Sequence, residues 1–237
     1  IVNLVKWRGG KFDTSFKTRR LWFIIVGIIS PIGFYDTNIL CSDCDNKIGK
    51  YDDYAGRFLR KLEKVVKEER IFGTITISTI SGEHYEYLKL KKFFISLIYR
   101  ASISQLKDFK NVSLGEMYEN EAKLFLENTC DNHNFEIIIQ KRTSDIYHSI
   151  DKMMLLFGKF KFEGINCYEL MLAGYRIIMK VDKRSFPKKI GFLSLNPECI
   201  IMLHQKIEDS KDNDFMQAII RKYHFPNKVR TKTKIEN

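Results

Sequence analysis

A Cys-x-x-Cys pair, Cys41-Ser-Asp-Cys44, stands directly before a long amphipathic pattern that begins at Asp45. Two thiolates two residues apart can bind one zinc ion, because the tight turn between them aims both sulfur atoms at one point. At the start of a helix, the dipole and the free backbone N–H groups also favour thiolate over thiol. The pair therefore predicts half of a structural zinc site, with Cys41 and Cys44 as two of its four ligands.

Other interpretations of the cysteines stay open. The pair is also compatible with a thioredoxin-like redox motif, although its Ser-Asp spacer suits that motif poorly, and with two incidental reduced cysteines. Cys130 and His133, in Cys-Asp-Asn-His, have ligand spacing and could complete a Cys3His shell; a polar loop holding one Cys and one His by chance is the alternative. His204 is interpreted as a core or surface histidine rather than a ligand.

The periodicity of apolar residues predicts helices first and strands later. Apolar positions spaced three and four apart predict a helix from Asp45, its expected N-cap, to about Arg70. The other expected elements are a strand at 74–80, helices at 87–105 and 114–128, a strand at 135–142, a hairpin at 166–180 that turns at Ala173-Gly174, and a helix at 212–223. This order predicts an α+β fold, a treble-clef-like zinc knuckle followed by helices and a mixed or antiparallel sheet.

We expect two domains, a knuckle with a basic N-terminus at 1–70 and an α+β domain at 71–237, with a softer boundary near 129–134. Five irregularly spaced cysteines do not form a secreted disulfide framework, which favours a reducing cytoplasm. The apolar run 21–35 contains Pro31 and is shorter than the roughly 20 residues of a membrane span. We interpret it as a buried strand or core segment and expect no membrane partner.

The net charge of +11 is concentrated at the two ends of the chain. Basic termini suit contacts with a phosphate backbone, since such contacts release counterions; lysine-rich tails that only keep the protein soluble are the alternative. Further basic residues lie on the helix that follows the cysteines. The candidate nucleic-acid-binding residues are Lys6, Arg8, Lys11, Lys17, Arg19, Arg20, Arg57, Arg60, Lys61, Lys228, Arg230 and Lys232.

The stretches GFYDTNILCSDCDNKIGKYDDYA, LKLKKFFISLIYRASIS, FKNVSLGEMYENEAK and INCYELMLAGYRIIMKVDK together resemble a family of uncharacterised bacterial proteins with an HNH-like, treble-clef front end. The resemblance implies that an earlier Cys-x-x-Cys pair and a catalytic histidine precede the pair matched by Cys41 and Cys44. Residues 1–40 contain neither Cys nor His, so these residues are expected upstream of Ile1 or the nuclease site has degenerated. The resemblance also implies that Arg100 is a structural, hydrogen-bonded arginine on a buried helix.

These observations predict a zinc-containing protein that binds DNA or RNA and derives from an HNH-like nuclease, in a bacterial defence system or a mobile element. One alternative is an active endonuclease that uses Mg²⁺ or Mn²⁺, with carboxylates near the knuckle as candidate ligands. Those carboxylates are Asp43, Asp45, Asp52 and Asp53. The other alternative is a non-catalytic subunit that binds a protein partner in a larger complex.

Overall fold

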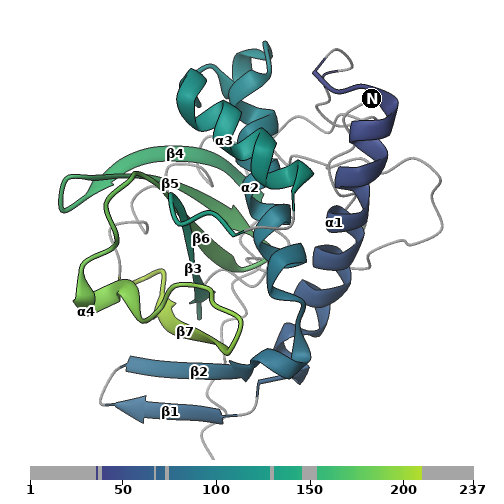
Figure 1. The fold of residues 1–237 in the computed structure, drawn as a ribbon. Helices are drawn as coiled ribbons and strands as arrows, with labels where there is room; N and C mark the ends of the chain where they lie inside the picture. The colour runs from purple at the N-terminus through teal and green to yellow at the C-terminus, as the bar shows by residue number, and fades with distance from the viewer. Residues whose placement is uncertain are drawn as a thin grey trace, which may run out of the picture.

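The computed structural model describes residues 36, 39–66, 68–72, 75–128, 131–145 and 154–209. In this part of the chain, α2 (Tyr87–Ile103) lies against a seven-stranded sheet, and α1 (Ser42–Lys61) and α3 (Glu116–Glu127) pack on α2 (Figure 1). The expected α+β class is confirmed. The apolar run 21–35 and the expected helix at 212–223 lie outside the described residues.

The helices are α1 (Ser42–Lys61), α2 (Tyr87–Ile103), α3 (Glu116–Glu127) and the short α4 (Lys188–Gly191), with 3₁₀ turns at Leu62–Lys64, Gly82–His84 and Lys107–Phe109. The expected N-cap at Asp45 is wrong: α1 already begins after Cys41, whose sulfur accepts the N–H of Cys44. The helix also ends earlier than expected. Val65 and Val66, which extended the predicted helix, lie beyond its end and pack against the core there. The chain then enters a strand.

The strands are β1 (Glu68–Phe72), β2 (Ile75–Ser81), β3 (Phe135–Thr143), β4 (Met154–Phe162), β5 (Ile165–Leu172), β6 (Tyr175–Val181) and β7 (Cys199–Lys206). Their order in the sheet is β1-β2-β7-β3-β6-β5-β4, and β3–β7 is the parallel pair in an otherwise antiparallel arrangement. The expected hairpin turn is confirmed: Ala173 and Gly174 have φ values of 54° and 81°, as a type I′ turn requires. The strands β1, β4 and β7 were not predicted.

The core alternates along the strands, as period-2 geometry requires. On β3, Phe135, Ile137 and Ile139 face the helices and share one cluster with α2, whereas Ile138 belongs to a smaller cluster on the opposite face. The larger cluster also includes residues of α1 such as Leu59, so α1 and the sheet share one core. The domain boundaries expected near residues 70 and 129–134 remain predictions.

A buried ion pair joins α1 to α2. The Arg100 guanidinium donates to both carboxylate oxygens of Asp52 at 3.0 and 2.9 Å, and each residue is only 2% exposed. Arg100 also donates to the carbonyl and hydroxyl oxygens of Ser96 one turn earlier. The expected structural role of Arg100 is therefore confirmed, and the pair sets how α1 lies on α2.

No helix among the described residues is long and apolar enough to cross a membrane.

Arg100→Met should lower the free energy of unfolding by about 3–5 kcal/mol, because it leaves the Asp52 carboxylate buried without its counter-ion. Urea denaturation measures this loss. Arg57→Met, at an exposed position of α1, is the control and should change stability by no more than about 0.5 kcal/mol. The double variant Arg100→Met/Asp52→Leu should recover much of the loss; a single-variant effect below about 1 kcal/mol would contradict the assigned role.

Candidate metal and nucleic-acid site on helix α1

The two cysteines of the Cys-x-x-Cys pair lie together at the start of α1. Cys41 is the N-cap, in an extended conformation, and its sulfur accepts the backbone N–H of Cys44 at 3.4 Å. Cys41 is exposed and Cys44 is half-buried in the first turn. The helix start therefore presents both thiols where backbone N–H groups favour negative charge.

The two thiols have different acidities. The backbone N–H of Cys44 lowers the pKa of Cys41, and the hydrogen bond between the two thiols lowers it further. The same hydrogen bond raises the pKa of Cys44, with a smaller contribution from burial. Cys41 is therefore the more acidic of the two thiols, and a metal ion bound by both sulfur atoms would displace the protons that they carry.

Of the ligands expected for a zinc site, the described residues place only Cys41 and Cys44 together. Among them, no group of three or more His, Cys, Asp or Glu side chains could hold a metal ion. The candidate ligand Cys130 lies outside the described residues, and His133 is exposed on the loop after α3. Glu127, at the end of α3, is close enough to contribute to the raised pKa of Cys44.

The solvent-facing side of α1 is basic, and we call it the α1 basic face. It consists of the exposed residues Lys47, Lys50, Arg57, Arg60 and Lys61 of the helix together with Lys64 of the 3₁₀ turn that follows it. At a rise of about 1.5 Å per residue, it extends for about 25 Å along the helix. Asp43 and Asp53 lie among these cations. Within the described residues, none of Lys47, Lys50, Arg57, Lys61 and Lys64 forms an ion pair.

Of the predicted nucleic-acid residues, the structure brings Arg57, Arg60 and Lys61 together on this face. The Arg60 side chain donates from Nε to the carbonyl of Gly56 at 3.0 Å. Lys47, Lys50 and Lys64 were missed, although the three-and-four spacing of the polar positions would have placed them on the same side. The candidates at the termini lie outside the described residues: Lys6, Arg8, Lys11, Lys17, Arg19, Arg20, Lys228, Arg230 and Lys232.

The four carboxylates considered as Mg²⁺ ligands do not gather at one metal site in the described part of the chain. Asp52 is buried and bonded to Arg100, so it is not available to a metal ion at the surface. Asp43 and Asp45 lie in the first turn of α1, where the helix dipole favours negative charge, and Asp53 is half-buried on the next part of the helix. Helix geometry explains the first two without a metal ion.

A second cluster, on the neighbouring strands β1, β2 and β7, has the residue types of a hydrolase triad. Ser78 Oγ lies 2.5 Å from His204 Nε2, and His204 Nδ1 lies 3.8 Å from Glu69 Oε1. Ser78 is only 1% exposed, so a substrate cannot reach its hydroxyl. The cluster is a polar contact between neighbouring strands near the β1 edge of the sheet, and His204 is half-buried within it.

Comparison with known proteins identifies no relative of the chain. No family model matches it, and neither a curated protein nor a solved structure matches it. Function is therefore inferred from the residues and their geometry.

Protonation of His204 should destabilise the fold. Burial lowers the pKa of His204 below 6.5 and Lys141 adds to this effect, while Glu69 and Glu63 oppose it. The unfolded chain then binds the proton more readily, so the stabilisation is complete above about pH 6.5 and is lost as the pH falls through the folded pKa. Urea denaturation at a series of pH values should show this loss.

His204→Gln keeps a hydrogen-bonding partner for Ser78 and removes the titration, so its stability should fall less than that of the wild type between about pH 7.5 and 5.5. Parallel curves for His204→Gln and the wild type would contradict the prediction.

Proposed function

We propose that the protein binds DNA or RNA through the α1 basic face, with a zinc ion held by Cys41 and Cys44 at the start of the same helix. The observation that supports this proposal best is the separation of the two sides of α1. One side, continued by the 3₁₀ turn at Leu62–Lys64, carries six exposed cations, while the other packs into the core through residues such as Ala55 and Leu59. The helix is therefore held rigidly with its charged side toward solvent.

The physical argument is electrostatic. Double-stranded DNA carries one negative charge per about 1.7 Å of axis, and cations that neutralise phosphates release condensed counterions. A basic helix face of about 25 Å can follow several successive phosphates. Because five of the six cations form no ion pair among the described residues, phosphate contacts would not have to displace an internal carboxylate there. Phosphate contacts of this kind position the protein on the nucleic acid and carry no sequence preference by themselves.

The zinc part of the proposal rests on the thiol geometry. Cys41 and Cys44 would hold the ion, and two further ligands would complete a tetrahedral shell. Bound there, zinc would supply a structural crosslink that fixes the chain at the start of α1. The relation to HNH-like treble-clef nucleases and the setting in bacterial defence or a mobile element rest on the sequence resemblance. In this proposal the knuckle serves binding rather than hydrolysis.

Neutralising three cations of the α1 basic face should weaken nucleic-acid binding and reduce its salt dependence. For the variant Lys50→Gln/Arg57→Gln/Lys61→Gln, the slope of log K against log salt should fall by about 3, because each lost phosphate contact removes about 0.9 from it on duplex DNA. Fluorescence anisotropy with a labelled duplex, measured at several salt concentrations, gives this slope.

A matched control removes the same charge elsewhere. Lys110, Lys161 and Lys188 are exposed and do not belong to the α1 basic face, so changing all three to Gln should leave the slope near the wild-type value. Equal losses in both triple variants would mean that net charge alone drives binding. No binding by the wild-type chain to duplex or single-stranded probes would reject the proposed function.

The zinc content should depend on both cysteines of the pair. Cys41→Ser and Cys44→Ser should each reduce the zinc content of the purified full chain from about one ion per molecule to a small fraction, because a lost thiolate removes one of four ligands. Mass spectrometry of the metal content measures this. Cys199→Ser, which changes a cysteine on β7, should retain the zinc; a wild-type protein without zinc would exclude the metal site.

A further inference from the structure

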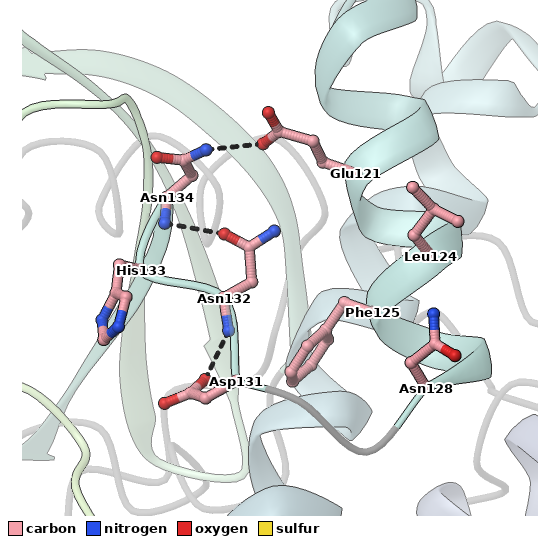
Figure 2. A pocket seen from close by; sticks show the side chains of 8 residues that line it. All are labelled: Glu121, Leu124, Phe125, Asn128, Asp131, Asn132, His133 and Asn134. Atoms are coloured by element: carbon pink, nitrogen blue, oxygen red, sulfur yellow. Dashed lines mark hydrogen bonds between the residues drawn. The ribbon is translucent and has the colours of Figure 1, made fainter.

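Helix α3 presents an apolar stripe to solvent, next to a pocket. Met117 and Leu124 are 44% and 56% exposed, and their seven-residue separation places them on the same side of the helix. The pocket has a volume of about 390 Å³ and lies between the second half of α3 and the loop at 131–134. Figure 2 shows Phe125 pointing from α3 toward this loop, with Leu124 and Asn128 beside it.

The loop wall of the pocket is held in place by two buried lysines. Lys91 donates to the Asp131 carboxylate and to the carbonyl of Asn132, and Lys180 donates to the carbonyl of His133. These lysines are 3% and 0% exposed. On the other side, the Asn134 amide donates to Glu121 of α3 at 2.8 Å, as the dashed line in Figure 2 marks. The pocket is thus preformed, which reduces the entropic cost of binding.

The surface around the stripe is acidic, in a chain whose net charge is +11. Helix α3 carries four glutamates and one lysine. Glu116 and Glu119, in its first turn, are favoured by the helix dipole, but the exposed Glu127 in the last turn is not. Glu121 lies between Met117 and Leu124 on the stripe and also lines the pocket. The dipole therefore does not explain the carboxylates nearest the pocket.

We propose that α3 and the adjoining pocket form a docking site for a basic amphipathic helix of a protein partner. Two apolar residues of that helix, spaced seven apart, would pack on Met117 and Leu124, and a bulky apolar side chain would enter the pocket against Phe125. Lysine or arginine side chains flanking these anchors would pair with Glu121 and Glu127. This is recognition of a helix in an apolar groove, with charge complementarity setting its orientation.

Charge selects this occupant over nucleic acid. A phosphate backbone would be repelled by Glu121 and Glu127, whereas a cationic peptide is attracted by them. The α1 basic face and the α3 stripe therefore bind partners of opposite charge. This inference does not depend on nucleic-acid binding by α1, and either can fail while the other holds.

The test uses a fluorescein-labelled peptide of about 16 Leu and Lys residues, with Leu at helical spacing, and the wild-type full chain. Anisotropy should show saturable binding, and Leu124→Ser should weaken it by about tenfold or more, as expected for an anchor residue. Phe192 is 54% exposed outside this surface, so Phe192→Ser is the matched control and should stay within about twofold of the wild type. Glu127→Gln should weaken binding and reduce its salt dependence.

Three results would overturn the proposal. The first is equal affinity of Leu124→Ser and the wild type, and the second is equal affinity for a scrambled peptide of the same composition that has no apolar face. The third is evidence for a different occupant, with peptide binding unchanged by Leu124→Ser. In that case the variant would weaken binding of a single-stranded oligonucleotide, or it would abolish self-association measured by sedimentation. Circular dichroism of Leu124→Ser checks that the variant keeps the wild-type fold.

Discussion

The buried ion pair between Arg100 and Asp52 is the contact on which the arrangement of the helices depends. Both groups are withdrawn from water, and a buried charge is tolerated only with a well-placed partner. The guanidinium pairs with the carboxylate in one geometry, through two parallel hydrogen bonds that it donates. Because this geometry is fixed, α1 can rotate little about its own axis on α2. Rotation would expose Leu59 and bury the lysines on the opposite side. One polar contact in the core therefore determines which residues of α1 the solvent meets.

Elements with strong local patterns were predictable from the sequence, and those specified by distant contacts were not. The helices α2 and α3, the strand β3 and the hairpin β5–β6 have clear periodicity or a turn signature, and the structure confirms them. The strand β1 begins with the charged residues Glu68, Glu69 and Arg70, and the short apolar run of β7 is fixed as a strand only by its pairing with β2 and β3. Val65 and Val66 fall at the spacing expected for a helix, but they lie beyond the end of α1. Their packing against the core, not helix formation, accounts for their apolar side chains.

The candidate site was predicted in part. The cysteine pair and three cations of α1 follow from residue type and spacing, and the structural role of Arg100 follows from the resemblance. The N-cap role of Cys41 was missed because cysteine is an unusual cap, and Asp45 offered a common one. The pocket beside α3 has no sequence signature: two buried lysines, Lys91 and Lys180, come from a helix and a strand far apart in the chain and meet at one loop. Only the assembled fold brings them together.

The position of β7 has a consequence for how the chain is assembled. This strand comes last among the seven in the described part of the sequence, yet it lies between β2 and β3. During synthesis, the β1–β2 hairpin and the sheet built on β3 each retain an unpaired edge until residues 199–206 leave the ribosome. Such edges are templates for pairing with other chains. A chain that ends shortly before this segment would contain two incomplete sheets with exposed edges. Such a chain would be prone to aggregate, because β7 would not be there to join the two sheets.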